Sequence, residues 1–505
     1  MRALRVTRLA ESAPAPGEVA AWERGAAGHP LRWRILSAIF VGTLMGPVDG
    51  SVVGIALPVI TQDLRTTLSV SEWVAMAYLL VISSLLLTWG RLGDMYGHRR
   101  TYLSGFGLFT GGSLLCAASP GIGWLIAFRA VQAVGAGMMM AAGPAIITDV
   151  FPASERGRAL GTNAVAVAAG LAIGPVLGGL LVEHFGWRSI FSINLPIGLV
   201  GTLWAARVLP GPRRVVRERF DLAGAMLLFS GLLLVLLALS QAPRWGWASA
   251  ATLGSAGAGA ALLGLFVAVE RRIDHPMVEL SVFKNRTFVL ANLSSLANYL
   301  AQSSVTFLLP FYLQNLRGIP PDRAGVLMLG FPVALTVIAP AAGYLTDRWG
   351  SRWLAAGGMA LMAVAVANMT RLDGATPLAG VFWGLALLGL GSALFQTPNN
   401  STIMGSVPRE RLGIAGGMLA SMRNIGMVLG IAVSGTVFMA VAGAQVETAA
   451  AEGGRFLAGL HGAMAAGAGI ALLGAVASVA ALPWTGRRRR AAVRVPRLDA
   501  DESRW

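Results

Sequence analysis

Long apolar stretches alternate with short polar ones along almost the whole chain, from about residue 35 to residue 483. Each stretch holds roughly 18–26 residues, which is enough for an α-helix to cross the hydrocarbon core of a bilayer. The pattern predicts an all-α membrane protein with 14 transmembrane helices. We expect them near residues 35–59, 73–92, 102–119, 122–147, 160–182, 190–209, 221–240, 249–269, 288–314, 324–345, 353–370, 378–403, 412–440 and 459–483.

The composition supports a membrane protein rather than a soluble enzyme. Hydrophobic residues make up 55% of the 505 residues and charged residues only 13%, whereas soluble domains carry about 25% charged residues. The five histidines have no metal-ligand spacing, and no phosphate-binding loop occurs in the sequence. We therefore expect no enzymatic activity, no metal and no bound cofactor, and an energy source other than ATP.

The positive residues lie mostly on one side of the predicted helices. With both termini placed inside, seven of the 40 Lys and Arg residues fall in outer loops and two lie deep in apolar segments, while all the others are cytoplasmic. The seven outer ones are Arg65, Arg188, Arg244, Arg317, Arg323, Arg371 and Arg455. This bias predicts a multi-pass protein of the bacterial inner membrane with both termini in the cytoplasm. It also explains the net charge of +16, so that no nucleic-acid partner is needed.

The two halves of the chain repeat each other at an offset of about 253–256 residues. A loop with Gly90, Asp94 and Gly97 recurs around Asp347, and Gly170-x-x-x-Gly174 recurs as Gly426-x-x-x-Gly430. The repeat predicts two six-helix bundles with two helices inserted between them, an architecture typical of transporters whose bundles rock about a central site. The predicted parts are a cytoplasmic tail (1–34), a first bundle (35–209), an inserted pair with its linkers (210–287), a second bundle (288–483) and a basic cytoplasmic tail (484–505).

Three charged residues, Asp49, Arg129 and Arg423, lie well inside apolar segments. A charge at the centre of a bilayer costs about 2.5–3.5 kcal/mol on insertion scales. Proteins that keep such residues usually use them, so these three are the first candidates for function.

The loop between the second and third segments carries a dense motif, Gly90-x-Leu-x-Asp94-x-x-Gly97-x-Arg99-Arg100. It resembles the signature loop of the major facilitator superfamily, and the chain as a whole resembles that superfamily's fourteen-span drug:proton antiporter branch. The resemblance implies that Asp94 contacts the N-terminus of a helix in the other bundle and latches one conformation. The alternative is an ordinary basic loop. Met95 replaces the arginine that often follows this aspartate, whereas the second copy has Asp347 followed by Arg348.

Two further motifs extend the resemblance. Arg129-x-x-Gln132 is similar to the family's fourth-span motif, in which the arginine tunes a proton-binding carboxylate. The alternative is a structural arginine bonded to backbone carbonyls. The fifth-span signature that marks exporters corresponds to the following residues: Gly170, Gly174, Pro175, Gly178 and Gly179.

Asp49 resembles the acidic centre of the branch's first-span motif. Burial favours a neutral carboxyl group and a nearby cation favours the carboxylate, so a buried carboxyl beside an arginine can take up and release a proton. Asp49 and Arg129 lie at similar depths, about 12–13 Å from the outer ends of their segments, and would meet if the first and fourth helices are neighbours. The alternative is a carboxylate that only supports helix packing.

The second half lacks this pair, since the matching positions hold Gln302 and Trp383. We therefore place proton coupling at Asp49, Arg129 and Gln132, and the substrate cavity largely in the second half. The candidate cavity residues are Asn298, Gln302, Thr306, Phe311, Phe395, Gln396, Asn399 and Arg423. The alternative for the polar ones is hydrogen bonding between helices. Arg423 faces the cavity, pairs with Asp49 in one conformation, or binds carbonyls; the sequence leaves these three open.

The predicted function is a proton-coupled antiporter that exports drugs, antibiotics or other amphipathic small molecules by alternating access, driven by the proton gradient. Its partners are the lipid bilayer, protons and the substrate, and we expect a monomer, with or without accessory proteins. The alternatives are a dedicated exporter of one endogenous metabolite, a proton-coupled uptake symporter, and a membrane sensor or scaffold that transports nothing.

Overall fold

A computed structural model describes residues 29–152, 154–210, 221–246, 248–272, 280–408, 412–443 and 453–481. Most of the predicted N-terminal tail, the basic C-terminal tail and the Asp347 side chain lie outside this description. The described residues form helices joined by short loops, with no strand among them.

The helices follow the predicted order. The first half contains α3 (Arg32–Asp63), α4 (Leu68–Tyr96), α5 (His98–Ala117), α6 (Ile122–Val150), α7 (Arg156–Phe185), α8 (Ser189–Ser192) and α9 (Asn194–Val208). The inserted pair is α10 (Leu222–Trp245) and α11 (Ala250–Glu270). The second half contains η1 (Leu280–Lys284), α12 (Arg286–Phe311), η2 (Tyr312–Leu316), α13 (Pro321–Met328), α14 (Gly330–Trp349), α15 (Ser351–Asn368), η3 (Met369–Arg371), α16 (Leu378–Gly405), α17 (Leu412–Ala442) and α18 (Gly453–Ala481).

Within the described residues, 11 helical stretches are long and apolar enough to cross a membrane. The pairs α8–α9 and α13–α14 each count as one such stretch, whereas α5, α10 and α12 do not meet this measure. In α12 the reason is visible in the sequence, because buried polar residues such as Asn292, Asn298 and Gln302 interrupt its apolar run.

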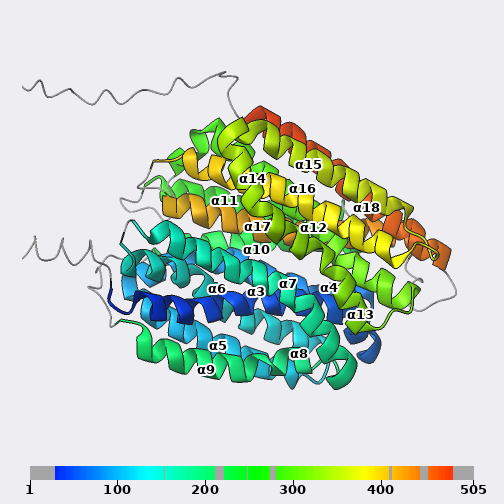
Figure 1. Cartoon of the computed structure of the whole chain (residues 1–505), viewed down its shortest axis with the longest axis horizontal. Coiled ribbons are helices and arrows are strands. Elements are labelled where there is room, and N and C mark those ends of the chain that lie inside the picture. The colour runs from blue at the N-terminus through cyan, green and yellow to red at the C-terminus, as the bar shows by residue number, and fades with distance from the viewer. Residues whose placement is uncertain are drawn as a thin grey trace, which may run out of the picture.

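The two ends of the helix bundle differ, and we name them by their connections. The tail end holds the start of α3 beside the end of α6, where the His29 amide donates to the Val150 carbonyl and Arg32 pairs with Glu155 at 2.8 Å. The far end holds the C-terminal end of α3, where Gln62 donates to Asn315 of η2 at 3.0 Å. In Figure 1 α3 begins at the left, and α8 and α13 mark the far end at the right.

The largest hydrophobic cluster that joins the two halves lies at the far end. It combines residues of both halves, including Ile55 and Phe191 with Leu308 and Leu313. At the tail end the first half has its own cluster around Tyr102 and the second half a separate one around Phe288. Figure 1 shows the blue-to-teal helices of the first half below the yellow-to-red helices of the second. The structure is therefore sealed at the far end, and its two halves have separate cores at the tail end.

Glycines bring the backbones of α3 and α7 into contact. A Cβ atom at Gly170 would lie 2.9 Å from the Leu44 carbonyl oxygen, and one at Gly178 would lie 3.0 Å from the Val52 Cα. Gly174 faces Ser51, whose hydroxyl donates to the Gly170 carbonyl at 3.3 Å. The same arrangement recurs in the second half, where Gly426 and Gly430 of α17 face the backbone of α12. Small side chains thus fix the α7 helix against the helix that carries Asp49.

The last glycine of this series makes the contact between the halves. A Cβ atom at Gly179 would overlap the backbone of Pro321 and Asp322 at the start of α13, and one at Gly325 would overlap the Pro175 carbonyl. Since neither position has room for a side chain, α7 and α13 approach each other at backbone distance. This contact forms part of the far-end seal.

The loops between α4 and α5 and between α14 and α15 are equivalent turns. Gly97 and Gly350 stand between the paired helices with φ of 98° and 82°. Glycine adopts this left-handed region at little cost, which explains why both copies of the loop motif keep it. Gly90, the first glycine of the motif, has open space around its Cα and makes no close helix contact in the described residues.

The inserted helices pack beside the seam between the halves. α10 and α11 meet through Gly231 and Gly259, and α10 also contacts α4 and α17 in a small apolar cluster of Leu80, Leu236 and Val428. The inserted pair is thereby fixed to both halves at once.

Replacing Gly179 by Val should weaken the far-end seal, because overpacking costs about 1–3 kcal/mol and the opposing backbone cannot rotate away. Nitroxide labels at Trp124→Cys and Trp383→Cys, exposed far-end positions in opposite halves, would report the separation by pulsed electron paramagnetic resonance. The native Cys116 is buried and should stay unlabelled. We expect a longer-distance population in the variant. Gly161→Val, in the same helix but with open space around it, is the control; equal distance distributions in both variants would contradict the seal.

Candidate functional site

The candidate site is centred on Asp49, in the middle of α3. Its carboxylate is 2% exposed and forms an ion pair with Arg129 of α6, which is 1% exposed. The structure therefore brings together the two residues that the depth argument paired. An isolated charge in this environment would be costly, and the ion pair with its hydrogen bonds offsets that cost.

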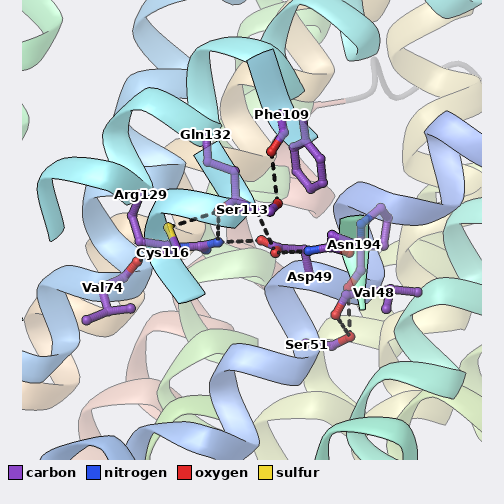
Figure 2. A network of polar contacts seen from close by, with 11 residues as sticks. Val48, Asp49, Ser51, Val74, Phe109, Ser113, Cys116, Arg129, Gln132 and Asn194 are labelled. Carbon is purple, nitrogen blue, oxygen red and sulfur yellow. Dashed lines mark hydrogen bonds and ion pairs between the residues drawn. The ribbon is translucent and has the colours of Figure 1, made fainter. Parts of the chain in front are cut away.

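Two amide side chains complete the shell of the carboxylate. Gln132 Nε2 donates to Asp49 Oδ1 at 2.9 Å, and Asn194 Nδ2 donates to the same oxygen at 3.0 Å. Figure 2 shows Arg129 and Gln132 of α6 and Asn194 of α9 converging on Asp49. Each of these donors is buried, so the carboxylate is held in one geometry by groups from α6 and α9.

Gln132 connects the carboxylate to the rest of the network. Its Oε1 accepts from Arg129 Nη1 at 2.6 Å, and its Nε2 also donates to Ser113 Oγ at 2.8 Å. Ser113 in turn donates to the Phe109 carbonyl at 2.8 Å, and the Cys116 thiol lies 3.8 Å from Gln132 Oε1. A change in the charge of Asp49 would thus reach α5 through a single amide.

Arg129 has further partners on its other side. Its Nε donates to the Val74 carbonyl of α4 at 3.0 Å, and its guanidinium lies 4.1 Å from the centre of the Tyr78 ring. The phenol of Tyr78 is buried and its oxygen has no hydrogen-bond partner in the described residues. Arg129 therefore binds a backbone carbonyl, as the structural alternative predicts, and binds the carboxylate at the same time.

Sequence reasoning missed three members of this site: Tyr78, Ser113 and Asn194. A signal was available for Asn194, since an asparagine inside an apolar segment needs a hydrogen-bond partner. Its partner lies 145 residues away, a distance in sequence that no local pattern reveals.

The predicted polar residues of the second half mostly bind one another. Asn298 Nδ2 lies 3.0 Å from Met362 Sδ of α15, and its Oδ1 accepts from Gln396 of α16 at 3.3 Å. Asn399 donates to the Ala291 carbonyl at 3.1 Å. These contacts match the alternative in which amides link helices. Gln302 differs, because its Oε1 is buried with no partner in the described residues.

The predicted aromatic residues lie in the core of the second half. Phe311 is 3% exposed and stacks edge-to-face on Phe307, and Phe395 is 1% exposed beside Gly358. Thr306 donates to the Gln302 carbonyl of its own helix at 3.3 Å. In this conformation the structure does not bring these three residues into one cavity. A pocket of about 400 Å³ occurs elsewhere, between α7, α13 and α16, and none of the predicted substrate residues lines it.

Arg423 is separate from the Asp49 site. It lies in α17 with its side chain partly exposed, and its Nη2 reaches Met140 Sδ of α6 at 3.8 Å. Among the described residues it has neither a carboxylate within ion-pair distance nor a carbonyl hydrogen bond.

The motif loop is open at the tail end. Asp94, with 60% of its side chain exposed, lies 3.3 Å from His98 Nε2, and Arg99 donates to the Ala206 carbonyl of α9 at 2.8 Å. Arg100 is exposed, and Arg348 of the second copy lies over the Tyr344 ring. The expected contact of Asp94 with a helix of the other half is not formed in the described part of this conformation.

The described residues contain no group of three or more His, Cys, Asp or Glu side chains that could hold a metal ion. The chemistry that the Asp49 site can perform is proton exchange at a carboxylate whose neighbours are an arginine and two amides. It holds no nucleophile positioned beside a base.

Curated relatives cover most of the chain. A riboflavin transporter, RibZ of Clostridioides difficile, is 38% identical over 81% of this chain and 88% of its own. The multidrug resistance protein Stp of Mycobacterium tuberculosis (strain CDC 1551 / Oshkosh) is 33% identical over 82% of this chain and 77% of its own. A tetracenomycin C resistance and export protein of Streptomyces glaucescens is 32% identical over 82% and 77%.

The fold matches solved transporters. A bacterial homologue of the human lysosomal transporter Spinster, in an inward-facing and occupied conformation, superposes with a TM-score of 0.66 at 15% identity, covering 90% of this chain and 97% of that one. The family model of the Major Facilitator Superfamily matches residues 39–275 and 291–502 of this chain. The chain is a transporter and belongs to the Major Facilitator Superfamily.

Proposed function

We propose that this chain is a proton-coupled antiporter of the fourteen-span drug:proton branch, which exports amphipathic small molecules across the bacterial inner membrane. The observation that carries the proposal is the buried Asp49–Arg129 pair with its two amide donors, present in one half only. Relatives named for multidrug resistance and antibiotic export support the direction of transport.

In this mechanism Asp49 takes up a proton when the far end opens, and Arg129 is released from the ion pair. Arg129 keeps Val74 and Tyr78 as partners, so it does not become an isolated charge. When Asp49 releases the proton on the tail side, the ion pair with Arg129 forms again. The membrane potential contributes about 2.3 kcal/mol per charge per 100 mV, which sustains a concentration gradient of several tens-fold.

The glycine contacts of α7 connect this site to the seal. Gly170, Gly174 and Gly178 pack on α3 on both sides of Asp49, and Gly179 of the same helix packs on α13 of the other half. A shift of α3 on protonation would therefore move α7 against α13. We place the tail end in the cytoplasm, as the distribution of positive residues predicts, so the present conformation is inward-facing.

We assign the loop around Asp94 to the opposite conformation. With the tail end open, Asp94 is exposed and bound only by a local histidine contact in the described residues. When the tail ends close, Asp94 would meet the start of α17, where the partial positive charge of a helix N-terminus stabilises a carboxylate.

A second candidate is the transport of one flavin-like metabolite. The relative named as a riboflavin transporter favours it, with 38% identity over 411 residues. Riboflavin is fluorescent, so the direction of its flux in vesicles with an imposed pH gradient separates an exporter from an uptake symporter. Transport of a panel of antibiotics in the same vesicles separates a carrier of many drugs from a dedicated carrier.

Asp49→Asn should abolish pH-driven transport, because the amide keeps the shape and hydrogen bonding of the side chain but cannot exchange a proton. The measurement is uptake of riboflavin and a panel of antibiotics into inverted vesicles as the lumen is acidified. Transport that still follows the pH gradient in this variant would rule out Asp49 as the proton site.

Asp373→Asn is the matched control for that experiment. Asp373 lies in an exposed far-end loop, and hydrogen bonds from the Thr376 hydroxyl and the Ala375 amide hold its pKa below the ordinary value. It therefore stays ionised over the pH range of the assay, and its replacement should leave the pH dependence unchanged.

Asp94→Asn should favour the conformation described here, because it removes a charge that stabilises only the tail-closed state. Labels at Leu160→Cys and Trp353→Cys, exposed positions near the tail end of each half, would follow that end. We expect the short-distance population to shrink and transport to fall several-fold, with protein levels maintained. An unchanged distance distribution would show that the loop does not latch the closed state.

A further inference from the structure

Arg423 is a partly exposed cation well inside the helix α17, and it has no anionic partner in the described part of the chain. The other deep arginine, Arg129, is neutralised by Asp49, and that carboxylate is already occupied by three donors. In the described residues its side chain has a hydrogen-bond contact with the sulfur of Met140, which lies 3.8 Å from Nη2. A thioether is a weak acceptor and cannot neutralise a guanidinium.

The cation lies between the halves of the transporter. Arg423 belongs to α17 of the second half, whereas Met140 belongs to α6 of the first. Both side chains, together with that of Gln396, are partly exposed. The two halves have separate cores toward the tail end, so the cluster sits where a substrate would contact both of them.

A polar cluster of the second half, made of Tyr299, Gln396 and Asn298, lies near the guanidinium. The Tyr299 phenol lies near enough to Arg423 for the two groups to interact electrostatically. Its hydroxyl oxygen lies 3.4 Å from Gln396 Oε1. Gln396 is bonded in turn to Asn298 at 3.3 Å. Gln396 is partly exposed, and its amide nitrogen carries a second hydrogen that can donate to a bound anion.

Flexible apolar side chains occur at the same place. Met140 of α6 contacts the guanidinium, and Met422 precedes Arg423 in α17; both are partly exposed. Methionine adapts to apolar bodies of different shape. The surroundings therefore fit a ligand with an apolar, aromatic body and one negatively charged group.

We propose that Arg423 is the anion-binding centre of the substrate site, and that the substrates are amphipathic organic anions bearing a carboxylate, sulfonate or ionised phenol. The inference rests on the proposed transport function and specifies the substrate class. Of the three roles that the sequence left open, it selects the one in which Arg423 meets the substrate. The anionic group binds the guanidinium, and the apolar body lies against the methionines.

The test compares two xanthene dyes of similar shape and opposite charge, fluorescein and rhodamine 123. Their binding to the purified full chain in nanodiscs of zwitterionic lipid is measured by fluorescence anisotropy at neutral pH. The wild-type protein should bind fluorescein more tightly than rhodamine 123. Arg423→Gln should weaken fluorescein binding about tenfold or more, as expected when one partner of a buried charge pair is removed, and should leave rhodamine 123 unchanged or bound more tightly. Arg423→Lys should keep most of the fluorescein affinity.

Arg34→Gln is the matched control, because Arg34 is an exposed arginine at the tail end of α3. It removes the same charge from the surface and should affect neither dye. The proposal is overturned if wild-type protein prefers rhodamine 123 or binds neither dye, if Arg423→Gln weakens both dyes equally, or if Arg34→Gln weakens fluorescein as much as Arg423→Gln does. Should Arg423→Gln fail to fold, the preference of the wild-type protein and the Arg423→Lys result still decide. The assay uses no gradient, so it can fail or succeed independently of the Asp49→Asn transport experiment.

Discussion

A charge held inside a membrane protein must be balanced where it lies, and the Asp49–Arg129 pair meets this requirement within one half of the molecule. Its neighbours extend the balance: Gln132 and Asn194 hold the carboxylate, and Val74 and Tyr78 hold the guanidinium. Removing one partner of such a pair costs several kcal/mol, about 3–5. In the proposed mechanism protonation of Asp49 would remove one charge of the pair reversibly, and this pair would be the point where the proton gradient drives a movement.

The path from that pair to the seal is short and made of backbone. Three glycines of α7 face the part of α3 that contains Asp49, and the fourth faces the start of α13. Close-packed helices transmit a displacement because they have no room to absorb it. The glycine signature of α7 can thus be understood physically: it gives α7 one face for the helix that carries Asp49 and one for the opposite half.

The sequence predicted the helices, the repeat and the Asp49–Arg129 contact, because each depends on patterns that local residues carry: apolar length, a constant offset and equal depth. It could not predict Asn194 as a ligand of Asp49, since that contact depends on how α9 packs on α3. Several of the residues predicted to line a substrate cavity pack against other helices in this conformation, for a related reason. The sequence marks Asn298 as a polar residue of an apolar segment, but only packing decides whether such a residue meets another helix or a substrate. Asn298 meets Met362 and Gln396.

The contrast between the two deep arginines has an energetic consequence for transport. Arg129 is balanced by Asp49 within the protein, and in the proposed cycle only protonation of Asp49 changes that balance. Arg423 has no such balance in the described residues, so a substrate anion would neutralise it on binding and restore it on release. An anion leaving the cell while a proton enters moves charge in the same electrical sense. The membrane potential would then act on both steps, at about 2.3 kcal/mol per charge per 100 mV. Separate sites for proton and substrate, one in each half, let both charges contribute without competing for Asp49.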